Sequence, residues 1–556
     1  MTVPTPYPTV PTSYPGVYIQ ELPSLVHTIT PSPTSTAVFV GYTHPFRTQQ
    51  PLTPVQLFSF ADYQANFGGF FSCPWQPDYV GQAVYQFFLN GGPTCYVVGL
   101  PAQEYYDYTG SPPEKQSVGL VAAASAVMTI GTGGSITFTA LQPVGVPAAA
   151  PETGTVGIPM QAVFSNIQSF KNQNDTSDIV ISYGTTVETY RHIQITNLVT
   201  ALQNSSLVTV ALSATPPSAY PPAGPQPLGY ASLASPDVAP AAGYTIINPG
   251  DFAQVFADYA PLDKVPIFNL LATPGITDNV VTSEAVAYCE RKRAFYIMDT
   301  PSPQTNLWDV NTVVVDLAQS AQLSPTPPVS INAAVYYPWL LTADPVTGNT
   351  TDPVTGKPIT APPSGFVAGI YGQEDSARGV WKSPAGIETA LLGTTGVDPH
   401  GVMTDHQQGI LNQNAIDCLR QFPGIGTVVF GARTTAGADA NTAQQQWKYV
   451  AVRRMALFIE QTLYANLTWA VFEGNAAPLW NALTQEVTAF MLSLFRQGAF
   501  AGDTPSQAFV VQCNSTTTTP MDVANGTVNI LVGFAPLVPA EFVVVQIAQR
   551  AGQAQS

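Results

Sequence analysis

Stretches with helical spacing alternate with apolar runs along much of this chain. Residues 34–43 (TSTAVFVGYT) form an almost continuous apolar run, which is typical of a strand buried on both faces. Residues 84–100 begin with amphipathic helical spacing, which ends at Asn90-Gly91-Gly92. A second apolar run follows. The pattern predicts the beginning of an α/β domain.

The order of a helix followed by a buried strand recurs downstream. Residues 251–275 and residues 284–301 each show it, and the stretches NTVVVDLAQSAQ and SINAAVYYPWL form a third unit. Strands that are joined through a helix run parallel in one sheet. The sequence therefore predicts a parallel sheet covered by helices.

Between residues 101 and 285 the pattern changes. Segments rich in Thr, Ser and Val, such as SITFTAL and DIVISYG, show little helical periodicity. A proline-rich connection at 216–227 ends this part. We interpret it as a β-rich insertion that interrupts the α/β domain, with few basic residues: Lys115, Lys171, Arg191 and Lys264.

The last third returns to helical spacing. Residues 447–472 predict a long helix with a broad apolar stripe, and a second helix is predicted from Pro478 to Gly498. The closing stretch EFVVVQIAQ, residues 541–549, is apolar on both faces, so a strand there needs cover on both sides.

The first residues predict an extended arm. Prolines at positions 4, 6, 8, 11 and 15 fix φ and remove backbone donors, which excludes a helix. Residues 14–22 then alternate in the manner of a strand, with Val17 and Ile19 on one side and Tyr18 on the other. This strand has no evident hairpin partner nearby.

Composition narrows the function classes. Charged residues make up 10% of the 556 residues, and 18 basic against 35 acidic residues give a net charge of -17. A negative chain repels phosphate backbones, so we expect no nucleic-acid partner. No basic leader precedes an apolar stretch at the beginning, and no apolar run reaches the roughly 20 residues that cross a bilayer, so we expect no secretory signal and no direct membrane insertion.

The cysteines predict neither a disulfide framework nor a zinc site. There are five, scattered, with no C-x-x-C spacing, and we interpret them as buried free thiols of a protein made in a reducing cytoplasm. They are Cys73, Cys95, Cys289, Cys418 and Cys513.

Nucleotide-binding and catalytic motifs are not evident. The pair Gly424 and Gly426 runs into a predicted strand rather than a helix, and Lys357 is followed by Pro358 where a phosphate-binding loop needs Ser or Thr. No G-x-S-x-G elbow occurs. We therefore expect no cofactor and no catalytic residue.

The densest polar cluster is DPHGVMTDH at 398–406. Its side chains Asp398, His400, Asp405 and His406 are the types that bind a divalent metal, which leaves a metal-dependent or serine hydrolase open as an alternative. The simpler interpretation is a solvated loop in which Asp405 caps a helix from about His406 to Leu419.

Two basic groups stand out on predicted helices. Arg291-Lys292-Arg293 is either an anion contact or a solvated face. Arg453 and Arg454 lie near the start of the long helix, where the helix dipole disfavours positive charge. We expect this pair to meet acidic partners inside or outside the chain.

Nine segments in chain order resemble the sheath protein of contractile phage tails and phage-tail-like contractile injection systems. The segment from about 106 to 240 has no counterpart, which fits a family whose inserted outer domains vary. The nine are YPGVYIQELPS, TSTAVFVGYT, FFLNGGPTCYVVGL, YYPWLLTADPVTG, PPSGFVAGIYGQEDSARGVWKSPAG, LNQNAIDCLRQFPGIGTVVFGARTT, WKYVAVRRMALFIEQTL, WAVFEGNAAPLWNAL and PAEFVVVQIAQ.

The resemblance implies a structural, non-enzymatic subunit that forms a helical homo-polymer around an inner tube and contracts to drive the tube through a target envelope. Implied partners are other copies of the chain, the inner tube protein, and baseplate and terminal cap proteins. Such a particle is assembled in the bacterial cytoplasm as part of a phage tail or phage-tail-like particle, and is then released or membrane-anchored.

Sheath subunits of this family donate strands from both ends to a sheet in adjacent subunits. The resemblance therefore assigns inter-subunit strands here, and the basic bias of the last third marks Arg453 and Arg454 as tube-facing candidates. The strand residues are Tyr14, Val17, Tyr18, Ile19 and Glu21 in the N-terminal arm, and Phe542, Val543, Val544, Val545 and Ile547 in the C-terminal arm.

The expected fold class is mixed α/β, with α/β core domains, a β-rich inserted outer domain and extended arms at both ends. The expected domains are an N-terminal arm (1–22), a middle α/β domain (23–105 plus 241–375), an inserted β-rich outer domain (106–240), an inner C-terminal α/β domain facing the tube (376–535) and a C-terminal strand arm (536–556). A secreted or virion-surface adhesin, suggested by the Thr-rich β segment, is the alternative from the binding class.

Overall fold

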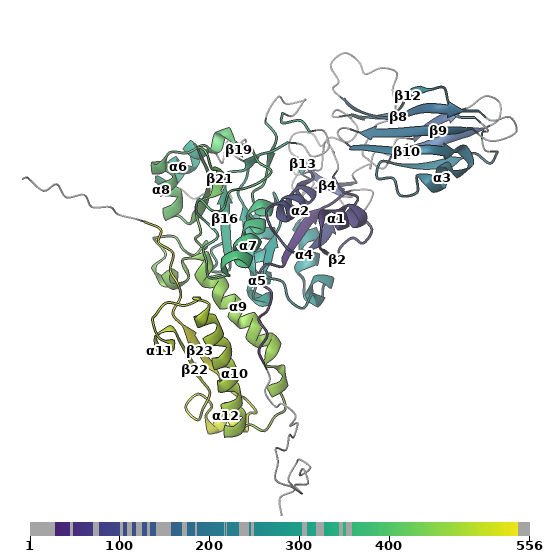
Figure 1. Ribbon diagram of the computed structural model, residues 1–556. Coiled ribbons are helices and arrows are strands. Elements are labelled where there is room, and N and C mark those ends of the chain that lie inside the picture. The colour runs from purple at the N-terminus through teal and green to yellow at the C-terminus, as the bar shows by residue number, and fades with distance from the viewer. Residues whose placement is uncertain are drawn as a thin grey trace, which may run out of the picture. The chain divides into compact units, whose positions relative to one another are not determined.

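A computed structural model describes most of the chain (Figure 1). The described residues are 28–44, 48–70, 77–100, 104–107, 114–117, 125–129, 134–140, 157–169, 175–183, 186–215, 217, 219–232, 244–245, 249–302, 309–318, 327–343, 348–351 and 358–542.

The chain divides into two compact units. One, here called the α/β unit, comprises Pro33–Phe458 and Val538–Ser556. The other, here called the helical unit, comprises Met1–Ser32 and Ile459–Leu537. The chain enters the α/β unit a second time after residue 537. Its C-terminal segment therefore belongs to the α/β unit, although the residues just before it belong to the helical unit.

An eight-stranded sheet forms the centre of the α/β unit. The strands from β3 to β20 run parallel, whereas the outer strands β2 and β21 pair antiparallel with their neighbours, so the predicted parallel sheet is confirmed. The order is β2 (Pro54–Leu57), β3 (Cys95–Leu100), β1 (Ala37–Tyr42), β14 (Leu270–Ala272), β15 (Phe295–Asp299), β16 (Ala333–Tyr337), β20 (Ile416–Phe422) and β21 (Gly426–Val429).

Helices cover both faces of this sheet, so successive strand residues are buried on opposite sides. In β1, Val38 and Val40 pack into the core on one face, and Ala37 and Phe39 into the core on the other. The first core contains α4 (Pro249–Phe256), α5 (Asn279–Lys292), α6 (Val310–Ala318) and α8 (Asp405–Gln413), and the second contains α1 (Phe60–Phe67), α2 (Tyr79–Leu89) and α7 (Ser364–Arg378).

Glycines on one face of α7 let α2 approach closely. A Cβ atom at Gly365 would lie 2.4 Å from Ala83 Cα, and one at Gly369 would lie 2.7 Å from Asn90 Cβ. The spacing of four residues puts both glycines on the same side of the helix. A small sheet near the start of α7 is formed by β17 (Leu340–Leu341), β18 (Thr360–Ala361) and β19 (Gly396–Val397).

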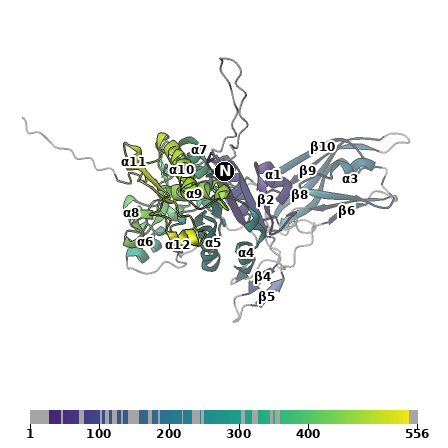
Figure 2. The same ribbon diagram turned by 90° about the horizontal axis from the view of Figure 1, so that it is seen from below.

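The segment between β3 and α4 forms antiparallel sheets of its own. Figure 2 shows β8, β9 and β10 side by side. Alternate residues of β9, such as Ile179 and Ile181, are buried in a core shared with Phe138 and Phe164. The first of these sheets has the order β10 (Thr186–Gln194), β9 (Thr176–Tyr183), β8 (Gly157–Gln168) and β12 (Gly224–Ser232). The second is β11 (Val208–Leu212), β7 (Ser135–Ala140) and β6 (Ser125–Thr129), and the third is β13 (Tyr244–Thr245), β4 (Glu104–Asp107) and β5 (Glu114–Ser117). Helix α3 (Leu198–Ala201) packs in the shared core.

The helical unit contains one of the two predicted long helices whole and the last part of the other. Helix α9 (Val450–Asn466) runs across the division at residue 458, and α10 (Ala477–Arg496) has the expected proline in its first turn. Gly498 follows α10 with φ at 79°, which only glycine adopts without strain. The unit also holds α11 (Pro505–Ala508), α12 (Pro520–Ala524) and a two-stranded antiparallel sheet of β22 (Phe509–Gln512) and β23 (Leu531–Phe534).

Two expectations differ from the structure. The division does not fall at residue 376, because β20 pairs with β16 and so joins 376–458 to the main sheet. The helix predicted from His406 to Leu419 ends at Gln413, and its N-cap is Thr404 in a capping box with Gln407 instead of Asp405. Pairing of β20 within the sheet overrides the local helical tendency.

The predicted inter-subunit strands lie outside the described residues, except for the first two residues of the C-terminal one, Glu541 and Phe542. Phe542 is described and is 73% exposed. Among the described residues, none of the helices is both long and apolar enough to span a membrane.

Candidate functional site

The polar cluster at 398–406 does not form a metal centre. Asp398 is fully buried and accepts a hydrogen bond from the backbone N–H of His400 (2.9 Å), while Asp405 points to solvent and pairs with Arg420 (3.0 Å). His406 is exposed on α8. In the described part of the chain, no group of three or more His, Cys, Asp or Glu side chains is placed to hold a metal ion. The cluster therefore gives the hydrolase alternative no assembled site.

The basic run at the end of α5 is paired within the chain. Arg291 lies 2.6 Å from Asp258 and stacks over the Tyr288 ring, and Lys292 lies 2.7 Å from Asp263. The Lys292 ammonium holds the pKa of Asp263 below its ordinary value. The run thus acts as a partly solvated face with internal partners.

Arg454 is occupied inside the α/β unit. Its guanidinium is 3% exposed, lies 2.6 Å from Asp375, donates to the carbonyl of Thr34 (2.9 Å) and stacks over the Tyr371 ring. Burial lowers the pKa of an arginine, but Asp375 outweighs it and raises the pKa of Arg454. These contacts argue against a tube-facing role for Arg454.

Arg453 is half-buried on the same helix. Its Nε donates to Asn332 Oδ1 (2.8 Å), and its guanidinium lies over the Trp447 ring. A tube-facing role for Arg453 stays a prediction. Arg454 meets an acidic partner, Asp375, in its own chain, as one of the two interpretations of the sequence held.

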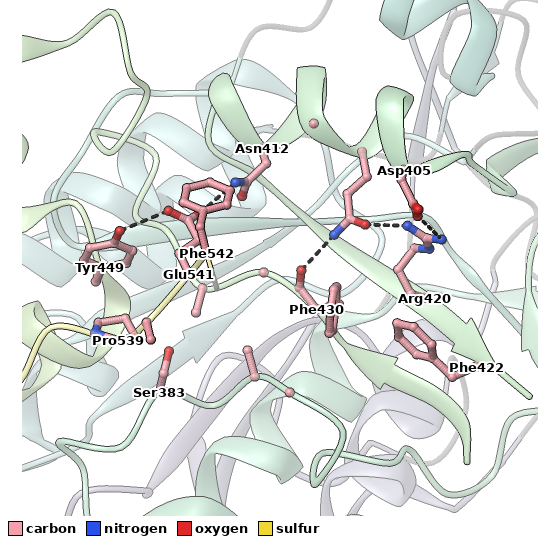
Figure 3. A pocket seen from close by; sticks show the side chains of 17 residues that line it. Ser383, Asp405, Asn412, Arg420, Phe422, Phe430, Tyr449, Pro539, Glu541 and Phe542 are labelled. Atoms are coloured by element: carbon pink, nitrogen blue, oxygen red, sulfur yellow. Dashed lines mark hydrogen bonds and ion pairs between the residues drawn. The ribbon is translucent and has the colours of Figure 1, made fainter. Parts of the chain in front are cut away.

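A pocket of about 580 Å³ receives the C-terminal segment of the α/β unit (Figure 3). Three side chains, Asn412, Arg433 and Tyr449, bind the Glu541 carboxylate and are here called the carboxylate socket. Figure 3 shows Asn412 and Tyr449 beside Glu541. Arg433 binds both oxygens: its Nε donates to Oε1 (2.7 Å) and its Nη2 to Oε2 (2.8 Å). Asn412 donates to Oε1 (2.7 Å), and the Tyr449 hydroxyl donates to Oε2 (3.0 Å).

Electrostatics favour the charged form of both partners. Burial raises the pKa of Glu541, but hydrogen bonds from Arg433 and Asn412 outweigh it, so the pKa lies below its ordinary value. Burial lowers the pKa of Arg433, but Glu541 and Asp439 outweigh it and the pKa is raised. Since Arg433 is only 1% exposed, these carboxylates offset the cost of burying its charge.

The segment that follows the N-terminal arm is held in the helical unit. The side-chain amide of Asn466 accepts from the backbone N–H of Thr30 and donates to its carbonyl, both at 2.9 Å. Thr462 accepts from the backbone N–H of Ser32 (3.1 Å). The chain therefore has an attachment point next to each predicted arm, one in each unit.

The two-stranded sheet of the helical unit is incomplete. One face packs on Phe500, whose ring lies 6.2 Å from Phe509 and 5.7 Å from Phe534. On the other face Val510 and Leu531 are 50% and 54% exposed. Within the described residues this sheet has no third strand, whereas stable sheets normally have three or more.

Sequence reasoning missed the carboxylate socket. In the sequence, Glu541 stands at the start of an apolar stretch, and Arg433 lies in one of the resembling segments. The scarcity of basic residues is a signal for such a pair. In a chain with 18 basic residues, an arginine between apolar stretches is expected to be buried with an acid. Which acid it meets, 108 positions away, was not encoded in any local pattern.

Comparison with known proteins confirms the resemblance. Residues 265–435 match the family model described as the phage tail sheath protein central domain. A putative prophage major tail sheath protein of Pseudomonas aeruginosa (strain UCBPP-PA14) is 27% identical over 195 residues, which are 34% of this chain and 46% of that relative. The chain thus matches about half the length of this curated relative.

Solved structures share the fold over nearly the whole chain. The sheath complex of an extracellular contractile injection system, PVC, in the contracted state has a TM-score of 0.54 at 21% identity, covering 98% of this chain and 99% of that chain. The helical sheath of the anti-feeding prophage (AFP) in the contracted state has a TM-score of 0.53 at 21% identity, covering 97% and 100%. The mixed α/β fold is therefore that of contractile sheath proteins.

Proposed function

We propose that this chain, which carries a phage tail sheath central domain, is a structural subunit of a contractile sheath. In this role it polymerises helically around an inner tube and contracts to drive the tube through a target envelope. Its partners are other copies of itself, the inner tube protein, and baseplate and terminal cap proteins. The sheath is assembled in the bacterial cytoplasm as part of a phage tail or phage-tail-like particle.

The observation that carries this proposal is the incomplete sheet of β22 and β23. An added strand from another chain completes such a sheet through main-chain hydrogen bonds, and alternating side chains set the register. The predicted strands 14–22 and 541–549 have the composition for this purpose. The N-terminal strand precedes an attachment point at Thr30, and the C-terminal strand begins at an attachment point, Glu541.

The stroke needs no fuel molecule in this proposal. It is driven by the free-energy difference between two packings of the same subunits. If contraction buried about 500 Å² more apolar surface per subunit, the gain would be roughly 10 kcal/mol before entropy and desolvation are subtracted. We infer that the chain works without catalysis.

Electron microscopy of the purified protein tests the proposal. Hollow or striated cylinders are expected from the full chain, and discrete globular particles would contradict it and favour the adhesin or hydrolase alternatives. Deleting residues 1–22 should abolish cylinders while circular dichroism stays nearly unchanged. Deleting residues 551–556, beyond the predicted C-terminal strand, is the matched control and should leave cylinders intact.

A further inference from the structure

The structure assigns the carboxylate socket of Asn412, Arg433 and Tyr449 as the anchor that holds the chain to the α/β unit at the start of the predicted C-terminal strand. This inference rests on the proposed function and names the residue, Glu541, through which the link between subunits is attached to the central sheet. Figure 3 shows Glu541 turned toward Asn412 and Tyr449 within the pocket.

The side chain of Glu541 is largely buried, whereas apolar side chains near it are exposed. Its side chain is 18% exposed, whereas Val538 before it and Phe542 after it are 63% and 73% exposed. Glu541 is the one polar side chain between Val538 and Phe542, so its carboxylate makes the side-chain hydrogen bonds of this segment to the rest of the unit. The chain is held at one carboxylate, and it emerges to solvent at the next residue.

The socket is built on the central sheet. The backbone N–H of Arg433 donates to Asp417 Oδ1 in β20 (2.8 Å), and two residues later the N–H of Thr435 donates to the carbonyl of Ala333 in β16 (2.8 Å). A Cβ atom at Gly431 would lie 2.8 Å from Asp417 Cα, so this segment runs tightly along β20. A pull on Glu541 is thus transmitted to strands in the middle of the α/β unit.

The donors suit a carboxylate and no neutral group. Arg433 presents two parallel N–H bonds to the two oxygens, and its remaining Nη1 is used by the carbonyl of Asn412 (2.8 Å) and by Asp439 (3.0 Å). A glutamine at position 541 would keep only one acceptor oxygen. Its NH2 group would replace the other oxygen and would face an N–H donor of Arg433. Because the pair is partly buried, salt screens it less than an exposed pair.

The two attachment points differ in kind. The N-terminal one consists of neutral hydrogen bonds, two to Asn466 at an exposed position and one to Thr462 at a buried position. The C-terminal one is a bidentate ion pair with a buried arginine. Charge-assisted bidentate pairs are roughly twice as strong as neutral hydrogen bonds. The C-terminal arm is accordingly the more firmly anchored of the two.

The test uses the full chain with Glu541→Gln. The first measurement is chymotrypsin cleavage after Phe542 in unassembled protein, with the product identified by its mass. Cleavage requires the segment to detach, so the variant should be cut at least tenfold faster than the wild type. The second measurement is electron microscopy, in which the variant should give fewer cylinders, and these should dissociate at lower denaturant concentration.

Glu388→Gln is the matched control. Glu388 pairs with Arg378 at 3.2 Å in the same unit, but both side chains are more than half exposed (56% and 54%). The substitution removes the same charge from an arginine pair, and both measurements should stay at the wild-type value. If Glu541→Gln fails to fold because Arg433 loses its partner, the double variant Arg433→Met with Glu541→Met removes both charges and should show the same fast cleavage in a folded unit.

Unchanged cleavage in a folded Glu541→Gln or double variant overturns the assignment. Fast cleavage with cylinders as abundant and as stable as those of the wild type also overturns it, because the socket then takes no part in the link. If the wild type forms no cylinders, the proposed function fails, but the cleavage rates still decide whether Glu541 anchors the segment.

Discussion

The central sheet of the α/β unit and the small sheet of the helical unit differ in completeness. The central sheet has eight strands, and β1, β15 and β16 are buried at every position. The small sheet has two strands, both half-exposed, with Val510 and Leu531 open to solvent. Both are built from the same β-branched and apolar residues.

This difference separates folding from assembly. A sheet whose strands find all their neighbours in one chain contributes to the stability of that chain, whereas a two-stranded sheet is marginal alone and gains from an added strand. Substitutions in the first should therefore change unfolding, and substitutions in the second should change polymerisation. The experiments below test this separation, from the largest expected effect to the smallest.

Removing the acid of the buried Arg454–Asp375 pair should cause the largest loss in the stability of the α/β unit. Asp375→Ala leaves the 3% exposed guanidinium of Arg454 without its carboxylate, which costs about 3 to 5 kcal/mol. Urea unfolding of unassembled protein measures the loss. Glu388→Ala, which breaks an exposed pair, should change stability by less than about 1 kcal/mol; equal losses for both variants would show that burial does not matter here.

A buried carboxyl on the central sheet should make stability depend on pH. Burial raises the pKa of Asp299 to about 6, although Gly275 and Ser364 donate hydrogen bonds to it. The folded state holds this proton more tightly than the unfolded state, so the stabilisation is present below about pH 4 and is lost as pH rises through about 6.

The shift of about two units corresponds to up to about 3 kcal/mol. Urea unfolding at pH 4 and pH 7 should show this loss in the wild type relative to Asp299→Asn, whose side chain does not titrate. Parallel pH profiles for the two proteins would mean that Asp299 is charged throughout and that its hydrogen bonds compensate for burial.

A charge on the open face of the small sheet should spare folding. Val510→Lys is expected to change the free energy of unfolding by no more than about 0.5 kcal/mol, because the side chain is half-exposed. Cylinder formation should nevertheless fall at least tenfold, since covering the lysine in an assembly desolvates its charge. Electron microscopy and sedimentation measure the loss.

Val187→Lys is the control for that experiment. Val187 is 58% exposed on β10, an edge strand of another antiparallel sheet, so its substitution should affect neither folding nor cylinders. If Val510→Lys behaves like this control, the open face of the small sheet is not covered in the assembly.

Periodicity determined the elements better than it determined their grouping. Repeats of helix and apolar strand predicted β14, β15 and β16 and their parallel order, because burial on both faces leaves a continuous apolar run. Residues 416–419 fall at the end of the helix expected from about His406 to Leu419, but pairing with β16 makes Ile416–Phe422 a strand. Local pattern does not reveal such a partner 80 residues away.

The sequence alone determined the α/β class, the β-rich insertion pattern, the two long helices and the resemblance to contractile sheath proteins, since each follows from local spacing or from short ordered segments. Only the tertiary structure decided that Arg454 is buried with Asp375, that the polar residues at 398–406 divide between an Asp398–His400 pair and an Asp405–Arg420 pair, and that Arg433 binds Glu541. Those outcomes depend on which side chains meet across the fold, and burial makes each meeting specific because an unpaired charge is costly inside a protein.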